Sequence, residues 1–324
     1  MGETEMTEEN ENAAVETAGK EEPKQDTEMY AVEKALFPSA DEEEPGENSA
    51  EEPLPDEEAE ASGKDPDRDS SGKTASSRQK ENDPLQQQID MLRTEQKRLV
   101  LSNLRAMIDH TLLKQTATRE DIRTLCDEAV AYGFHTVCVQ PVYVRECFGR
   151  LKDHRDIRIA CVVGFPMGEN TVDTKVFETK RAIRDGADEI DAVVCISAVK
   201  NGDYKYVKKE VRSLVKAAGD HPVKIILETS LLTEEEIRKT AEIVCGCRAA
   251  FLKTSTGYFG TGATPEQVEI LKDVSKGRAE VKASGGIRTA RQMRDLVDAG
   301  ASRIGTSSGT AIMEELKAEF FPEE

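Results

Sequence analysis

The amino-acid sequence predicts an α/β protein: a (β/α)8 TIM barrel preceded by a helix and a long disordered acidic N-terminal tail. Between residues 103 and 320, eight short apolar runs alternate with amphipathic segments. The turn after the first run, residues 109–114, contains no glycine. A doubly wound open sheet usually has fewer strands and carries a glycine-rich fingerprint in this turn. Eight strand–helix units of this length are typical of a closed barrel.

The N-terminal segment differs sharply from the rest of the chain in charge. Residues 1–90 contain 28 acidic and 8 basic residues, whereas the remainder has 35 acidic and 36 basic residues. A segment rich in Glu, Ser, Gly and Pro buries too little apolar surface to offset its ordering entropy. We therefore predict that residues 1–82 are a disordered extension. Its short apolar patch, residues 29–37, could be a docking motif, but a transient helix is the favoured interpretation.

A leading amphipathic helix is predicted over residues 83–102. Asp83 is a candidate N-cap, Pro84 suits the first helical position, and Leu85 and Ile89 begin an apolar stripe at helical spacing. The barrel domain then covers residues 103–320.

The apolar runs of the barrel are predicted to be its strands. They are residues 104–108, 136–139, 157–163, 189–194, 223–227, 249–252, 279–281 and 302–304. Threonines precede four of the intervening helical patterns and are predicted N-caps: Thr118, Thr233, Thr264 and Thr289.

Several function classes are excluded by composition. No segment has the basic start and apolar core of a signal peptide, and no apolar run reaches membrane-spanning length. Seven irregularly spaced cysteines without an export signal predict reduced thiols in the cytoplasm. Cys245 and Cys247 are too close for a standard zinc site, so no metal is predicted. The nearly neutral barrel predicts no nucleic-acid partner.

Two lysines are the most informative residues of the chain. Lys253 and Lys282 each lie at the end of, or within, a short apolar run that precedes a small-residue turn. Lysine is almost never fully buried without a partner. An amine that is removed from water and placed near a second cation loses its proton more easily and becomes a nucleophile near neutral pH. This is the chemistry of Schiff-base formation with a carbonyl substrate.

Further polar residues are predicted at the barrel strands. Asp191 lies within an apolar run, Lys224 lies within another, and Asp109 and Thr111 follow the first. Of the four histidines, only His110 lies in a run interpreted as functional. Buried charges must be paired, so a self-satisfied structural network is the alternative. A purely structural barrel core would use apolar layers, which favours a functional network.

Glycine-rich turns follow the last two predicted strands, at residues 284–288 (SGGIR) and 305–309 (GTSSG). Barrels often hold a phosphate with these two loops, where backbone N–H groups and a helix N-terminus face the anion. A phosphorylated substrate is therefore predicted. Ordinary tight turns are the alternative.

Six segments, in order over residues 103–315, resemble those of 2-deoxyribose-5-phosphate aldolases. They are residues 109–113 (DHTLL), 164–168 (GFPMG), 188–191 (DEID), 253–257 (KTSTG), 282–288 (KASGGIR) and 305–309 (GTSSG). The resemblance implies a class I aldolase that reversibly cleaves 2-deoxy-D-ribose 5-phosphate to glyceraldehyde 3-phosphate and acetaldehyde, in deoxyribose phosphate catabolism. It implies no cofactor, because the iminium is the electron sink. It also implies a homodimer, to which the leading helix could contribute.

The resemblance also implies roles for individual residues. Lys253 is the expected Schiff-base nucleophile and Lys282 the cation that lowers its pKa. Asp191 is the expected proton relay, assisted by Lys224, Asp109 and Thr111. The expected phosphate-binding residues are Gly285, Gly286, Ser307 and Ser308.

Three positions depart from the common pattern of this family. Cys195 stands where Asn is frequent, Gln140 where Asn or Tyr is usual, and Tyr258 where some members carry a phosphate-binding Lys. These departures bear on affinity and rate. Two other functions are alternatives. The first is another phosphosugar-binding barrel enzyme, which would not need the lysine pair. The second is a barrel that serves as a binding module, with the acidic tail contacting an unknown partner.

Overall fold

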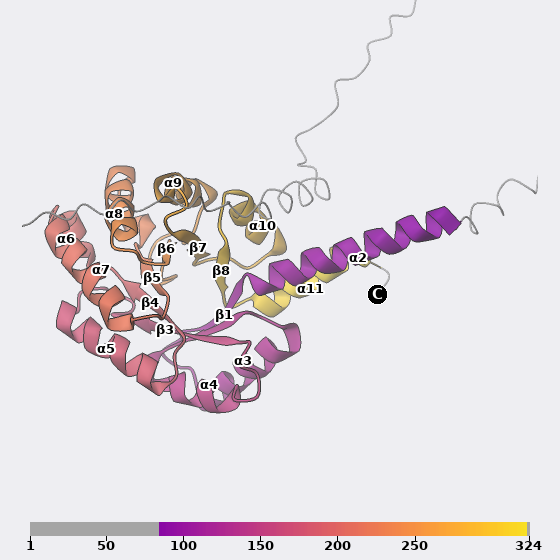
Figure 1. Cartoon of the computed structure of the whole chain (residues 1–324), viewed down its shortest axis with the longest axis horizontal. Coiled ribbons are helices and arrows are strands. Elements are labelled where there is room, and N and C mark those ends of the chain that lie inside the picture. Colours follow the sequence, from indigo (N-terminus) through magenta and orange to yellow (C-terminus); the bar gives the residue numbers. More distant parts are fainter. Residues whose placement is uncertain (1–83, 323–324) are drawn as a thin grey trace, which may run out of the picture. The chain divides into compact units, whose positions relative to one another are not determined.

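The computed structural model describes residues 84–322, and the predictions for residues 1–82 and for Asp83 as an N-cap lie outside this range. Eight parallel strands form a closed barrel in which each strand pairs with its neighbours in sequence and β1 pairs with β8. Helices surround the barrel (Figure 1). The predicted TIM barrel is confirmed.

The strands of the barrel are short and almost wholly buried. They are β1 (Ile108–Leu112), β2 (Thr136–Val139), β3 (Arg158–Val163), β4 (Glu189–Val193), β5 (Val223–Ile226), β6 (Phe251–Lys253), β7 (Glu280–Ser284) and β8 (Arg303–Thr306). Seven of the eight predicted strands are confirmed. Each of the seven overlaps a strand of the barrel, and its ends differ from the observed ends by three residues at most.

The first predicted strand, residues 104–108, was wrong. Leu104 belongs to the preceding helix, and β1 begins at Ile108. The reason is that Val100, Leu101 and Leu104 recur at helical spacing and are buried against the barrel. Asp109 therefore lies within β1 instead of following it.

The helices and 3-10 turns complete the description. They are α2 (Pro84–Ala106), α3 (Arg119–Tyr132), η1 (Pro141–Tyr143), α4 (Val144–Arg150), α5 (Val172–Asp185), α6 (Ile196–Lys200), α7 (Tyr204–Ala218), η2 (Thr229–Leu231), α8 (Glu234–Gly246), α9 (Pro265–Ser275), α10 (Ala290–Asp298) and α11 (Gly309–Phe320). The four predicted threonine N-caps are confirmed, since each side chain accepts a hydrogen bond from the backbone N–H three residues later.

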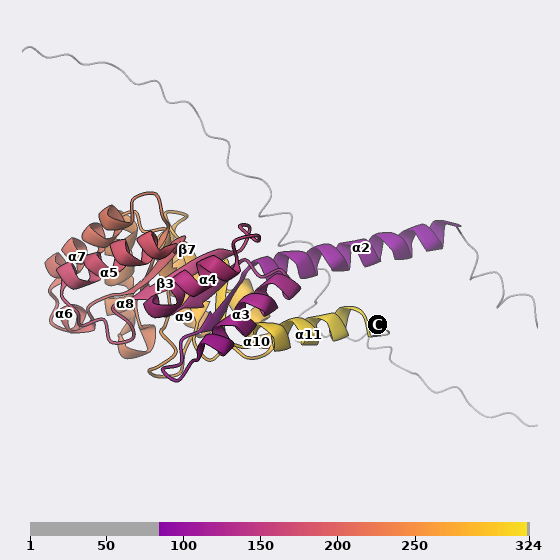
Figure 2. The same ribbon diagram turned by 90° about the horizontal axis from the view of Figure 1, so that it is seen from below.

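The leading helix α2 is longer than predicted and runs outward from the barrel (Figures 1 and 2). Val100, Leu101 and Leu104 near its end are buried, whereas Leu92 and Leu99 are exposed. The Lys97 ammonium donates a hydrogen bond to the Phe320 carbonyl at 2.9 Å, which ties α2 to the end of α11. Within residues 84–322, no helix is long and apolar enough to cross a membrane.

The barrel interior consists of layers of four side chains supplied by alternate strands, as the strand register requires. The layer at the N-terminal ends of the even strands is Thr136, Glu189, Phe251 and Arg303. The next layer, from the odd strands, is Asp109, Ala160, Lys224 and Lys282. The third, nearest the C-terminal ends, is Cys138, Asp191, Lys253 and Gly305. Most TIM barrels fill these positions with branched apolar residues. This barrel fills more than half of them with charges.

Candidate active site

A cavity of about 270 Å³ opens at the C-terminal ends of the strands. Lys253 lies at its base, and the loops that follow β1, β6, β7 and β8 form its walls. The residues that line it are Thr111, Leu112, Leu113, Lys114, Lys253, Thr256, Gly257, Tyr258, Ser284, Gly285, Gly286, Ile287, Arg288, Gly305, Thr306 and Ser307. Chemistry in TIM barrels is found at this face.

Lys253 and Lys282 are adjacent residues on paired strands. β6 and β7 pair with Lys253 opposite Lys282, so the two side chains enter the barrel interior side by side, from adjacent layers. Asp191 of β4 lies between them: its Oδ2 is 2.7 Å from Lys253 Nζ and 2.8 Å from Lys282 Nζ. Lys253 is 3% exposed, and Lys282 and Asp191 are fully buried. The structure therefore brings together the three residues that the sequence singled out first.

Lys224 and Asp109 complete the centre of the network. Lys224 Nζ lies 2.8 Å from Asp191 Oδ1 and also donates to the Glu189 carboxylate. Lys282 donates to Asp109 as well as to Asp191. Every buried ammonium here thus has a carboxylate partner, which is the condition for placing charges in a barrel core.

The lysines of this network differ in their pKa. Burial lowers the pKa of Lys253, and the nearby Lys282 ammonium lowers it further, although Asp191 opposes both effects. Lys282 and Lys224 are also buried, but their carboxylate partners outweigh the burial and raise their pKa. Lys253 is therefore the lysine of this network that is disposed to be a free amine.

Asp191 keeps its charge in this setting. Burial by itself would raise the pKa of its carboxyl group, but the ammonium groups of Lys224, Lys253 and Lys282 hold that pKa well below its usual range. A buried carboxylate that contacts the Lys253 amine is placed to exchange a proton with it.

The far side of the cavity is lined by the two glycine-rich loops. Gly285, Gly286 and Ser307 contribute to its wall, with Arg288 near its mouth. Both glycines have positive φ angles, 92° and 78°, which turn the chain directly after β7. Ser308 is not among the lining residues. It is the N-cap of α11, and its N–H donates to Thr306 Oγ1 at 2.9 Å.

Two residues of the first strand have different positions. Thr111 lines the cavity, and its hydroxyl donates to the Asp109 carbonyl at 2.8 Å. His110, interpreted from sequence as part of a functional run, points to the outside of the barrel. Its Nε2 is 2.7 Å from Glu128 of α3, and its ring lies 4.9 Å from that of Phe134. His110 is not among the residues that line the cavity.

Sequence reasoning assigned no role to Glu228, the residue that follows β5 by two positions. Its backbone is left-handed, with φ 54°, and its side chain is buried. Glu228 accepts hydrogen bonds from the Thr256 N–H, at 3.1 Å, and from the Thr256 hydroxyl. It therefore braces the loop that follows Lys253. An isolated acid directly after a buried strand is the signal that could have indicated it.

Tyr258 and Gln140, two of the residues that depart from the family pattern, donate hydrogen bonds to the same backbone carbonyl. The Tyr258 hydroxyl donates to the Leu113 carbonyl at 2.6 Å, and Gln140 Nε2 donates to the same carbonyl at 3.1 Å. The Phe165 ring packs edge-on against Tyr258 at 5.3 Å. Tyr258 thus links the loops after β6 and β1 across the cavity. Cys195 lies elsewhere: its N–H donates to Glu210.

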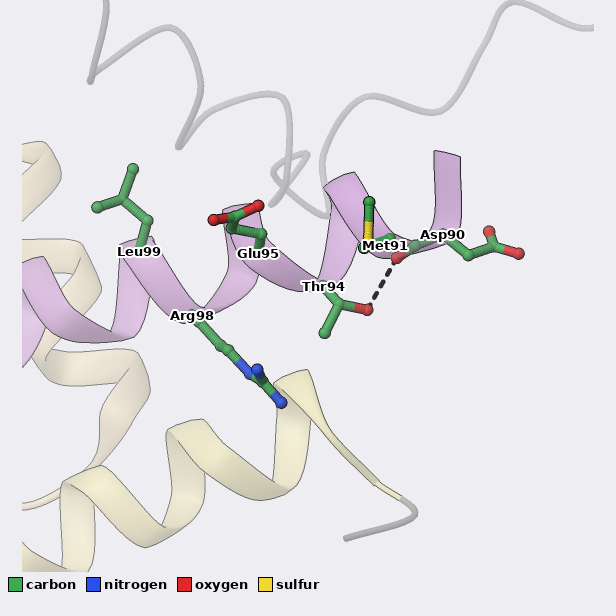
Figure 3. Close-up of a pocket in the computed structure, with 6 residues that line it drawn as sticks. All are labelled: Asp90, Met91, Thr94, Glu95, Arg98 and Leu99. Carbon is green, nitrogen blue, oxygen red and sulfur yellow. Dashed lines mark hydrogen bonds between the residues drawn. The ribbon is translucent and has the colours of Figure 1, made fainter. Parts of the chain in front are cut away.

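Within residues 84–322, no group of three or more His, Cys, Asp or Glu side chains is arranged to hold a metal ion. A shallow hollow on α2 is lined by Asp90, Met91, Thr94, Glu95, Arg98 and Leu99 (Figure 3). In this view Arg98 points toward α11, while Leu99, Glu95 and Met91 point away from it. These side chains are exposed or half-buried and belong to one helix, unlike the buried groups at the strand ends.

Comparisons with known proteins agree with this geometry. Residues 104–315 match the model of the DeoC/LacD aldolase family. A deoxyribose-phosphate aldolase of Staphylococcus carnosus is 48% identical over 212 residues, which are 65% of this chain and 96% of that protein. One from a Thermoanaerobacter species is 48% identical over 216 residues, covering 66% and 96%. The tetrameric deoxyribose phosphate aldolase of Aeropyrum pernix has a similar structure, with a TM-score of 0.64, 33% identity and coverage of 71% and 97%.

Proposed function

Since the chain belongs to the DeoC/LacD aldolase family, we propose that it reversibly cleaves 2-deoxy-D-ribose 5-phosphate to D-glyceraldehyde 3-phosphate and acetaldehyde through a Schiff base on Lys253. The proposed activity is that of the deoxyribose-phosphate aldolases named above. This chain matches 96% of the length of each of the two bacterial ones. We propose that it acts in deoxyribose phosphate catabolism.

The observation that carries this proposal is the arrangement of Lys253, Lys282 and Asp191. A nucleophilic amine must be unprotonated, and Lys253 combines burial with an adjacent cation on the paired strand. A proton-transfer isomerase would need a carboxylate base and would not need this amine. The lysine pair therefore favours aldol chemistry over the other reactions of phosphosugar barrels.

The reaction begins when the Lys253 amine attacks the substrate aldehyde. The carbinolamine that forms loses water to give an iminium, which requires a proton on the departing hydroxyl. Loss of the proton from the substrate C3 hydroxyl then breaks the C2–C3 bond, which releases glyceraldehyde 3-phosphate and leaves the electron pair of that bond in an enamine, with the iminium as electron sink. Protonation of the enamine carbon and hydrolysis then release acetaldehyde and restore the amine.

Asp191 is the proposed proton carrier for these steps, because its carboxylate contacts Lys253 directly at 2.7 Å. Lys282 is the proposed cation that keeps Lys253 unprotonated, and it shares the same Asp191 oxygen. Lys224 and Asp109 lie one contact further away and would hold the charges in place. Thr111 lines the cavity and can order water near them.

The phosphate is proposed to bind at the glycine-rich wall. Gly285, Gly286 and Ser307 line the cavity there, and backbone N–H groups in such turns bind anions. Ser308 would contribute through the N-terminus of α11, which begins at the next residue. Because Tyr258 stands where some relatives carry Lys, backbone groups must supply more of the binding.

A turnover assay tests the proposed function. We expect the purified chain to release glyceraldehyde 3-phosphate from 2-deoxy-D-ribose 5-phosphate, detected by coupled reduction, and Lys253→Met to lose activity by about 10³-fold or more. The exposed Lys239 of α8 offers a matched control, Lys239→Met, with unchanged turnover. If the folded wild-type chain leaves this substrate intact, the proposal is wrong.

A further inference from the structure

The ion-pair network does not end at the active site but continues to the opposite end of the barrel. Glu189 and Arg303 are the first residues of β4 and β8, so they lie at the N-terminal ends of the strands, two layers from Lys253. Arg303 Nη1 is 3.0 Å from Asp109 Oδ1 and 3.9 Å from Glu189 Oε2. Lys224 contacts Glu189 as well as Asp191.

These contacts form one connected set. From the far end, Arg303 joins Asp109 and Glu189, Lys224 joins both to Asp191, and Asp191 joins Lys253. The side chains of its inner members, Lys224, Asp109 and Asp191, are fully buried. Charges in such a medium interact over several ångströms with little screening.

The charge count of this set is informative. Its ion pairs join four basic side chains, Lys224, Lys253, Lys282 and Arg303, to three acidic ones, Asp109, Glu189 and Asp191. With every group ionised the set carries one excess positive charge. It becomes neutral when one base gives up its proton. Uncompensated buried charge is costly, so neutrality of the whole set favours one free amine.

We propose that Glu189 and Arg303 are positioning residues that set the protonation of the Lys253 amine from the far end of the barrel, by fixing the charge balance of the interior network. This inference rests on the proposed role of Lys253. Removal of the Glu189 charge adds to the positive excess and favours the free amine. Removal of the Arg303 charge abolishes the excess and favours the ammonium.

The neighbours of these groups are consistent with a purely electrostatic role. The Phe251 ring, in the same layer as Arg303, lies 5.5 Å from the Arg303 guanidinium and 5.7 Å from Lys224 Nζ. His135 Nε2 is 4.0 Å from Glu189, and burial followed by the nearby Arg303 lowers its pKa, which keeps it neutral. Other ionisable groups near the set are Cys138 and Glu228 near Lys253, Cys161 near Asp191 and Glu280 near Arg303.

A pair of opposite substitutions tests the proposal. The probe is acetaldehyde with borohydride, and the readout is the pH midpoint of adduct formation on Lys253. We expect Glu189→Gln to lower this midpoint by about 0.5 to 1 pH unit and Arg303→Met to raise it by about the same amount. The double variant should return to within about 0.3 unit of the wild type, because the two charge changes cancel.

Controls separate charge from shape. Arg303→Lys keeps the charge with a different geometry and should keep the wild-type midpoint, as should Glu242→Gln in the exposed Arg278–Glu242 pair. Arg303→Gln replaces Arg303→Met if the latter does not fold. Shifts of the same sign, no shift, or a shift in Arg303→Lys would overturn the inference. Absence of a wild-type adduct on Lys253 would instead overturn the proposed function.

Discussion

At the scale of single residues, the site depends on one carboxylate oxygen shared by two lysines. Asp191 Oδ2 contacts Lys253 and Lys282 at nearly equal distances. The lysines nevertheless differ, because Lys282 has Asp109 as a second partner, whereas the carboxylate paired with Lys253 is Asp191. The extra carboxylate raises the pKa of Lys282, and the resulting cation lowers the pKa of Lys253. The different numbers of carboxylate partners thus make Lys253 the proposed nucleophile and Lys282 the cation that lowers its pKa.

Replacement of Lys282 tests this division of roles. In Lys282→Met, Lys253 keeps Asp191 but loses the adjacent cation, so its pKa should rise by about one to two units. A base that must be unprotonated fixes the acidic limb of the kcat/KM profile, and this limb should move to higher pH by the same amount, with activity below the limb reduced by about 10- to 100-fold. The kcat/KM profile from pH 5 to 10 measures both effects. An acidic limb at its wild-type position would refute the assigned role.

At the scale of elements, the loop after β7 is positioned by close backbone contact. A Cβ atom at Gly262 would lie 2.2 Å from the Gly285 carbonyl oxygen, and Gly262 has a φ of 81°. Glycine at this position lets the loop after β6 touch the proposed phosphate loop. Gly277 provides a comparison, because its φ of 76° is similar but a Cβ there would meet nothing within 4 Å.

We therefore expect Gly262→Ala to raise KM for the phosphorylated substrate by about 10-fold or more, since it displaces Gly285. Gly277→Ala introduces the same backbone strain, which costs about 1 kcal/mol of stability, and should leave KM unchanged. Steady-state kinetics of both variants decides the matter. Equal KM values would mean that the contact with Gly285 does not position the site.

The sequence predicted the strands and helix caps well, because apolar runs and threonine N-caps are local signals. It was wrong where two signals overlapped: Leu104 fits either the end of an apolar strand or the last turn of an amphipathic helix, and packing on the barrel decided for the helix. Lys253, Lys282 and Asp191 were found as charges within apolar runs. Arg303 and Glu228 were not predicted to have a role, because their contacts with Asp109 and Thr256 form only when distant strands pair around the barrel.

At the scale of the whole molecule, a second buried ion pair joins the helical ring to the barrel. Lys175 of α5 donates to Glu210 of α7 at 2.5 Å and to the Val193 carbonyl of β4 at 2.8 Å, and both charged side chains have no exposed surface. The other Glu210 oxygen accepts from the Cys195 N–H. Two helices and the loop after β4 are therefore fixed to one another at the active-site end.

Removal of one partner leaves an unpaired buried charge. We expect Lys175→Met to lower the free energy of unfolding by about 3 to 5 kcal/mol, and Lys175→Met with Glu210→Leu to recover part of that loss. Urea unfolding of the three proteins measures the differences. A single variant within about 1 kcal/mol of the wild type would show that the pair is unimportant for stability.

The central claim is that Lys253 forms the Schiff base, and borohydride trapping with acetaldehyde tests it most directly. The amine and the aldehyde condense to an iminium with loss of water, and hydride reduction leaves a stable N-ethyl lysine. Peptide mapping by mass spectrometry should find one ethyl group on the peptide that contains Lys253, at neutral pH, and on no other lysine in stoichiometric amount. An adduct on Lys224 or Lys282 instead, or a folded protein without any adduct, would contradict the account.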